Sequence, residues 1–176
     1  MKSKKQVLWL TQAAIIAALY AVLTVVQGVL APGTASMAVQ FRVSEAMTLL
    51  CCITPAAIPG LTLGCFLANF LFMDALPVDM ILGSLATLLA GLAMYALRGI
   101  QWKKLPLPAA LMPAIFNGVI IGLEIEIFFI EGPFHFGSFL IQGGCVALGE
   151  LAVCFTLGLL LYKALDRPQV RGFLKT

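Results

Sequence analysis

Long apolar runs, separated by short polar or proline-containing connections, make up most of the chain. The first run extends from about Val7 to Leu30 and follows lysines at positions 2, 4 and 5. A helix needs roughly 20 apolar residues to cross a hydrocarbon core of about 30 Å, so this run predicts a complete transmembrane helix. It is longer than the roughly 7–15 apolar residues of a secretory signal peptide, and we therefore expect it to be retained.

The remaining runs predict five further helices. Residues 42–73 are apolar but are interrupted by Thr54-Pro55 and Pro59-Gly60, which predicts two short helices. Three more spans follow, and they cover about Asp79 to Leu97, Pro106 to Ile130 and Ser138 to Tyr162. The predicted fold is an all-α integral membrane protein with six transmembrane helices, forming a single domain over residues 1–176.

Composition supports this fold and excludes several functions. The chain is 61% hydrophobic and 11% charged, with a mean hydropathy of +1.04, whereas soluble proteins average about half apolar and a quarter charged. Its five cysteines form no C-x-x-C pair and it has one histidine, so we expect buried thiols and no metal site. It has no phosphate loop, nucleophile elbow or H-E-x-x-H motif, which predicts that it is not an enzyme and does not hydrolyse ATP.

Basic residues predict the topology of the spans. Lysine and arginine in short flanking segments stay on the cytoplasmic side of a membrane. If the amino-terminal lysines, residues 98–104 and the tail from Lys163 onward are all inside, both termini are cytoplasmic and residues 42–73 cross twice. Ten of the eleven basic residues then lie on one side, and the exception is Arg42.

Ionisable and amide side chains inside the spans are the candidates for binding, because each costs several kcal/mol when it is unpaired in the membrane. We expect a substrate site formed by Arg42, Glu45, Asn69, Asn117, Glu124, Gln142 and Glu150. Asn117 and Glu124 are seven residues apart and share one helix face, whereas Glu126 is rotated by about 200° from Glu124. Internal salt bridges and amide bonds between helices are the alternative.

The excess of carboxylates over Arg42 favours a ligand that is rich in N–H donors or cationic. Aromatic residues such as Phe41 offer a surface on which a planar ring stacks, although each Phe alone is also explained by ordinary packing.

Small residues on the first helix predict a close helix contact. Ala13, Ala17 and Ala21 are spaced by four, with Ala14 and Ala18 alongside, and such strips allow backbones to approach. The contact is either within the chain or with a separate membrane subunit. The G-x-x-x-G spacings of Gly60 with Gly64 and Gly118 with Gly122 predict close packing in the same way.

The segment Gln40-Phe41-Arg42-Val43-Ser44-Glu45-Ala46, together with the Ala-rich first helix and the polar connection before it, resembles QueT-type substrate-binding (S) components of energy-coupling factor (ECF) transporters. The resemblance implies the S-component fold and uptake of a queuosine precursor, a 7-deazaguanine such as queuine or its biosynthetic bases, into a bacterial cell. Substrate binds on the outer side, so Gln40, Phe41, Arg42 and Glu45 are expected at the mouth of the site and residues 33–40 as its lid.

The same resemblance implies the partners. S components associate with a transmembrane coupling subunit and two cytoplasmic ATPases, so ATP is used by those subunits and no cofactor is bound by this chain. The surface of Ala13, Ala14, Ala17, Ala18 and Ala21 is expected to meet the coupling subunit. A nucleic-acid partner is not expected, and the location is the bacterial cell membrane.

Three other functions are compatible with the sequence. A self-contained proton-coupled transporter would use the glutamates as relays, and an S component of the same scaffold would take a different vitamin-like or nucleobase ligand. A structural or assembly membrane protein would use its buried charges only to fix helix packing.

Overall fold

The computed structural model describes residues 2–31, 41–71, 76–167, 170 and 172. Over these residues the chain folds into six helical rods, with no strand beyond one isolated bridge between Trp102 and Leu105. Four rods are α1 (Lys2–Leu30), η1 (Val43–Cys52), α2 (Ala57–Leu71) and α3 (Pro77–Leu97). The fifth is α4 (Leu107–Ala110), α5 (Met112–Glu124) and η2 (Ile125–Phe129), and the sixth is α6 (Phe136–Val153), η3 (Cys154–Gly158) and α7 (Leu159–Leu165).

The all-helical class and the order of the helices agree with the apolar runs of the sequence. Four rods are long and apolar enough to cross a membrane: Ser3–Leu30, Pro77–Leu97, Leu107–Phe129 and Phe136–Leu165. The predicted pair of short helices is present as η1 and α2. At about 2.0 Å per residue for a 3₁₀-helix and about 1.5 Å for an α-helix, they reach only about 20 and 22 Å, so six full crossings stay a prediction.

The short helix η1 lies in the core of the bundle. Its residues from Ser44 to Cys52 are buried, and it contacts α1, α2, α3, α6 and α7. A 3₁₀-helix of ten residues is unusual, because runs beyond three or four residues are uncommon. The segment that begins beside Arg42 is therefore enclosed by the other helices, and its side chains face protein instead of lipid.

Close approaches of glycine set the spacing of the rods. A Cβ added to Gly60 would lie 2.7 Å from the Ala13 carbonyl oxygen. The backbones of α1 and α2 are therefore in close contact at this glycine. A Cβ added to Gly122 would lie 2.6 Å from the Cα of Gly143. The backbones of α5 and α6 are in close contact here in the same way. Both G-x-x-x-G predictions are confirmed, since only glycine fits such contacts without displacing backbone.

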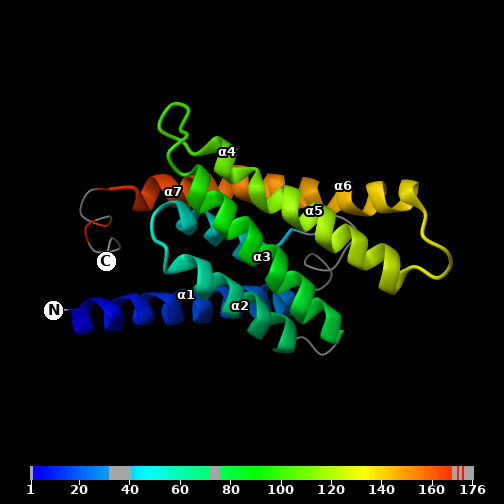
Figure 1. Ribbon diagram of the computed structural model, residues 1–176, viewed down its shortest axis with the longest axis horizontal. Helices are drawn as coiled ribbons and strands as arrows, with labels where there is room; N and C mark the ends of the chain where they lie inside the picture. The colour runs from blue at the N-terminus through cyan, green and yellow to red at the C-terminus, as the bar shows by residue number, and fades with distance from the viewer. Residues whose placement is uncertain (1, 32–40, 72–75, 168–169, 171, 173–176) are drawn as a thin grey trace.

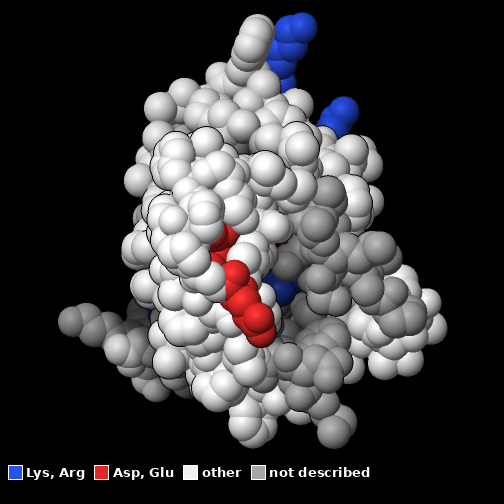
Figure 2. Space-filling view, turned by 90° about the vertical axis from the view of Figure 1, so that its right-hand side faces the viewer, with Lys and Arg blue, Asp and Glu red and all other residues white. Residues whose placement is uncertain are grey.

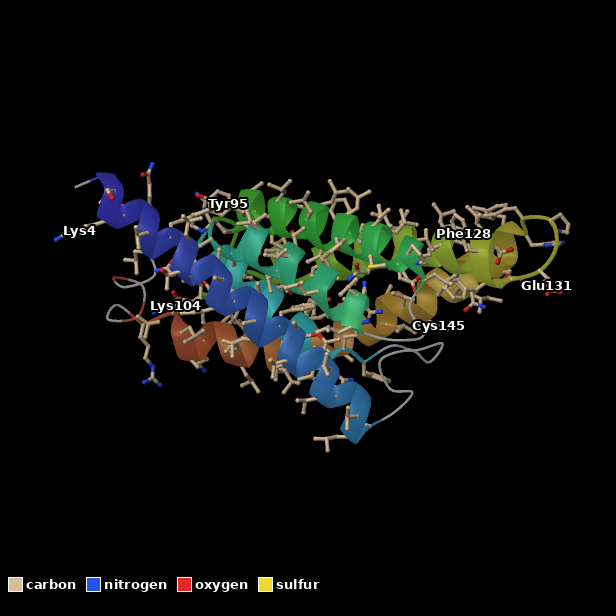
Figure 3. The ribbon with its side chains drawn as sticks, turned by 90° about the horizontal axis from the view of Figure 1, so that it is seen from below. Lys4, Tyr95, Lys104, Phe128, Glu131 and Cys145 are labelled. Carbon is tan, nitrogen blue, oxygen red and sulfur yellow. The ribbon has the colours of Figure 1, made fainter. Side chains whose placement is uncertain are left out.

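The charged groups divide between the two ends of the bundle. Helix α1 begins and α7 ends at the same end of the molecule (Figure 1). Lys4 and Lys104 lie toward that end, and Glu131 lies at the opposite one (Figure 3). This arrangement agrees with basic clusters that share one side of the membrane, while the assignment of that side to the cytoplasm stays a prediction.

Candidate functional site

A buried tyrosine and two charged residues form the centre of the candidate site. Glu45 lies on the first turn of η1 and is 2% exposed, and the hydroxyl of the fully buried Tyr20 on α1 donates a hydrogen bond to its Oε1. Arg42 directly precedes η1 and is half-buried. Its guanidinium interacts electrostatically with the carboxyls of Glu45 and Glu150, so one cation serves carboxyls from two helices.

The fifth and sixth rods supply an amide and a carboxyl that contact each other. Asn117 on α5 donates a hydrogen bond of 2.9 Å from its Nδ2 to the Oε1 of Glu150 on α6. Both side chains are buried. One N–H of the amide is used on Glu150, so the Asn117 side chain retains its oxygen and its second N–H as groups that it can offer a ligand.

Glu124 adds a third carboxyl from the carboxyl-terminal end of α5. It is 3% exposed and lies against the carboxyl of Asp79 on α3, within electrostatic range of Arg42. Two carboxyls this close are stable together when a proton or a cationic group lies between them. The pair is therefore suited to hold a positively charged or protonated partner.

Three of these carboxyls each retain an unused acceptor. The atoms Glu45 Oε2, Glu124 Oε1 and Glu150 Oε2 are buried and have no hydrogen-bond partner among the described residues. A buried acceptor left without a donor costs about 1–3 kcal/mol, so three of them within electrostatic range of one arginine make a candidate site whose chemistry is complementary to N–H donors. At the end of the molecule opposite the amino terminus, acidic side chains form a strip on the surface beside a recessed positive side chain (Figure 2), whereas the three unpartnered oxygens lie beneath the surface.

A polar stripe on α1 fixes the backbone that carries Arg42. The Gln27 side chain donates to the Phe41 carbonyl oxygen and accepts from the Val43 N–H at 2.8 Å. Thr24 donates to Ser44 at 2.7 Å. Both residues lie on the same helix face as Tyr20.

Sequence reasoning missed this stripe, although its signal was present. Tyr20, Thr24 and Gln27 are spaced by four and three residues within an otherwise apolar run, which is the repeat of one helix face.

Other expected site residues have different roles or places. The Asn69 side chain donates to the Asp79 backbone oxygen at 2.9 Å and so joins α2 to α3. Gln142 is half-buried on α6, and Phe41 is 45% exposed. Gln40 and the expected lid over residues 33–40 lie outside the described residues.

Glu126 faces a different partner from Glu124, as their angular separation predicted. Its Oε1 accepts a hydrogen bond of 2.9 Å from the backbone N–H of His135, in the connection between η2 and α6. Glu126 thereby fastens that connection, while Glu124 interacts with Arg42 and Asp79.

The alanine strip of α1 divides between two environments. Ala17 is 3% exposed and Ala21 is 7% exposed, and a Cβ on Gly64 would lie 2.8 Å from the Ala17 carbonyl oxygen. Packing within the chain therefore accounts for these two, and Ala13 is half-buried beside Gly60 in the same contact. Ala14 and Ala18 are exposed, and for them a contact with another subunit stays a prediction.

The cysteines contribute no recognisable metal site. All five are free thiols, and four of them are buried. Within the described ranges, no group of three or more His, Cys, Asp or Glu side chains is placed to hold a metal ion.

Comparison with known proteins gives two matches. The family model described as "QueT transporter" matches residues 10–167. A curated protein of Lactococcus lactis subsp. cremoris (strain MG1363), named "Queuosine precursor transporter QueT", is 34% identical over 150 residues, which are 81% of this chain and 83% of that protein. No solved structure matches the chain.

Proposed function

The chain belongs to the QueT transporter family, and on that premise we propose that it binds a queuosine precursor as the substrate-binding S component of an ECF transporter. It is a multi-pass protein of the bacterial cell membrane. The ligand is a 7-deazaguanine such as queuine or one of its biosynthetic bases. The binding residues are Arg42, Glu45, Asn117, Glu124 and Glu150.

The observation that supports this proposal most strongly is that three buried carboxyl oxygens without a partner in the described chain, on Glu45, Glu124 and Glu150, belong to side chains that all interact with Arg42, unlike the similarly unpartnered Oε2 of Glu126. Purely structural charges are normally satisfied by other protein groups, because an unsatisfied one is costly. Here Arg42 is shared among several carboxyls, and their spare oxygens come from η1, α5 and α6. Three acceptors on three elements surround a ligand more readily than they fix one helix contact.

The chemistry of a guanine-like base is complementary to these groups. Its Watson–Crick edge presents adjacent N–H donors, which a carboxylate accepts, and a carbonyl oxygen, which a guanidinium such as that of Arg42 binds. A basic amine substituent would be held by the carboxyls of Glu124 and Asp79, which lie against each other. The site thus recognises donors at more than one edge of a planar ring.

The proposed partners are a transmembrane coupling subunit and two ATPases. The chain has no nucleotide-binding motif of its own, so ATP-driven uptake requires other subunits. Exposed Ala14 and Ala18 on α1 leave a low surface against which another membrane helix packs closely.

A direct binding experiment tests the ligand. Purified protein in detergent is titrated with queuine, with its precursor bases and with guanine, while circular dichroism confirms that the helices are intact. We expect at least one deazaguanine to bind at micromolar concentration or below and guanine to bind more weakly. If all of them fail to bind the folded protein, the substrate assignment is wrong.

A self-contained proton-coupled transporter is the second candidate, and the adjacent carboxyls of Glu124 and Asp79 favour it, since such a pair is able to carry a proton. Reconstituted vesicles separate the two. An S component binds ligand but does not accumulate it without ATP and partner subunits, whereas a proton-coupled transporter accumulates it when only a pH gradient is applied.

Paired alanine variants test the coupling partner. Ala18→Leu adds bulk to an exposed face and is expected to impair co-purification with a coupling subunit while ligand binding stays near normal. Ala17→Leu adds the same bulk to a buried contact and is expected to lower thermal stability. Co-purification that is unaffected by Ala18→Leu would place the partner surface elsewhere.

A further inference from the structure

A tight turn follows the end of α3 and has an unusual backbone. Trp102 and Leu105 exchange two backbone hydrogen bonds of 2.9 Å, so Lys103 and Lys104 form a two-residue loop. Their φ angles are +50° and +65°. Positive φ at both central residues is the requirement of a type I′ turn, which normally contains Asn-Gly or similar pairs. Lysine is disfavoured there, so neither residue is explained by turn formation.

The turn is fastened to the bundle. The Gln101 side chain donates to the hydroxyl of Tyr162 on α7 at 3.2 Å, and Tyr162 is 1% exposed. On the other side, the half-buried Leu105 packs against the hydrophobic core of the bundle. Both flanks of the turn are therefore anchored, and its two lysines project from a fixed base.

The exposed side chains of the turn combine an aromatic ring with cations. Trp102 is 69% exposed, and both lysines are exposed as well. Arg98 is the residue directly after α3, and its Cζ lies 3.6 Å from the centroid of the Tyr95 ring. A large exposed indole is unfavourable in bulk water but favourable in the interfacial layer of a membrane, where tryptophan is enriched. Three cations, Arg98, Lys103 and Lys104, lie within four residues of Trp102 in the chain.

The position of the turn places it at that layer. Helix α3 is one of the four rods long and apolar enough to span a membrane, and it ends at Leu97. The turn begins only a few residues later, at the depth where lipid headgroups replace hydrocarbon. Lys104 lies toward one end of the molecule (Figure 3), as expected for a residue beyond the end of a span.

We propose that this turn is a binding site for the headgroup of an anionic phospholipid, with Lys103 and Lys104 contacting the phosphate and Trp102 inserting its ring beside the glycerol backbone. Lysine binds phosphate as a point charge, and the positive-φ turn directs two of them outward from one short loop. Anionic lipid surfaces attract basic segments next to transmembrane helices. The site is independent of the proposed transport substrate, which binds within the bundle.

The test uses full-length protein and lipid retention measured by native mass spectrometry, with phosphatidylglycerol as the anionic probe and phosphatidylcholine as the neutral one. The double variant Lys103→Asn/Lys104→Gly removes both charges and supplies the residues that a type I′ turn prefers, so the turn is preserved. The control Lys4→Gln/Lys5→Gln removes two charges from the amino-terminal end of α1. Trp102→Ala tests the ring with the charges intact.

We expect the turn variant to retain several-fold less phosphatidylglycerol than the wild type, Trp102→Ala to retain less as well, and the amino-terminal control to differ little. Retention of phosphatidylcholine should stay the same in all of them. Equal losses in the turn variant and the control would show a general charge effect and overturn the site. Unchanged retention in the turn variant would also overturn it, as would displacement of the lipid by millimolar inorganic phosphate, which would indicate a site for free phosphate.

Discussion

Replacing Glu150 with glutamine distinguishes a role in ligand binding from a role in helix packing, because it changes one side-chain atom and keeps the shape of the residue. The Oε1 of Glu150 accepts the hydrogen bond from Asn117 at 2.9 Å, whereas its Oε2 is buried without a partner in the described chain. Glutamine has nearly the same shape, and its carbonyl oxygen can keep the Asn117 contact. The change therefore falls on the second position, where an N–H₂ donor replaces an acceptor.

The expected loss of affinity follows from that exchange. A hydrogen bond to a charged group contributes about 1.5–3 kcal/mol, so removing it raises the dissociation constant roughly 10- to 100-fold. Two donors that face each other, one from the variant and one from the ligand, add to this loss. Stability is expected to change by less than about 1 kcal/mol, because one unpartnered buried polar group replaces another and the cost of burying a charge is removed at the same time. Arg42 keeps charge interactions with Glu45 and Glu124.

The assay pairs calorimetric titration of a deazaguanine with a thermal unfolding curve of the same preparation. Glu131→Gln is the matched control, since it removes one negative charge from an exposed connection. We expect that control to bind like the wild type. Two results would refute the reasoning. In the first, the Glu150→Gln protein binds the deazaguanine with wild-type affinity. In the second, it loses affinity only because its unfolding temperature falls steeply. The second outcome would assign Glu150 to packing.

Two further substitutions test the bundle around the site. Tyr20→Phe removes the hydroxyl that donates to Glu45, and we expect a stability loss of about 1–3 kcal/mol in thermal unfolding; an unchanged midpoint would mean that this contact is not formed. Gly143→Ala is expected to lower stability by about 1–3 kcal/mol because its Cβ meets the backbone of the fifth rod. The neighbouring Gly144→Ala is the control, since nothing lies within 4 Å of its Cβ, and equal effects of the two would contradict the close contact.

Helix order was predictable from sequence because apolar runs and their interruptions mark where spans begin and end. The break at Thr54-Pro55 lies between η1 and α2, so the predicted pair of short helices is confirmed over the described residues of this segment, whereas Pro59-Gly60 lies inside α2 near its start and does not interrupt it. The expected mouth at Arg42 and Glu45 and the shared face of Asn117 and Glu124 stay predictions.

The rotation of each helix was harder to predict. In a soluble protein the polar face identifies the outside, but lipid is as apolar as a protein core. The alanines of α1 therefore carried no sign of which ones pack inward, and the structure places Ala17 inside and Ala18 outside. For the same reason Tyr20 was overlooked as a partner of Glu45, since its place in an apolar run is equally compatible with a lipid-facing ring.

The hydrogen-bond partners of the polar side chains could not be predicted from the sequence either. Asn69 was expected in the site because an amide in a span needs a partner. That partner is the Asp79 backbone oxygen, which no pattern of residue types identifies. The Glu124 and Asp79 pair likewise depends on how α3 packs against α5, which only the folded chain determines.

Mass spectrometry of the small molecules that co-purify with the folded protein is the most direct measurement of the central claim. Wild-type protein isolated from bacterial membranes should release a 7-deazaguanine base, and Glu150→Gln prepared in the same way should release little or none. An unrelated compound bound in its place, or equal amounts of the base from both proteins, would contradict a substrate site built on these carboxyls.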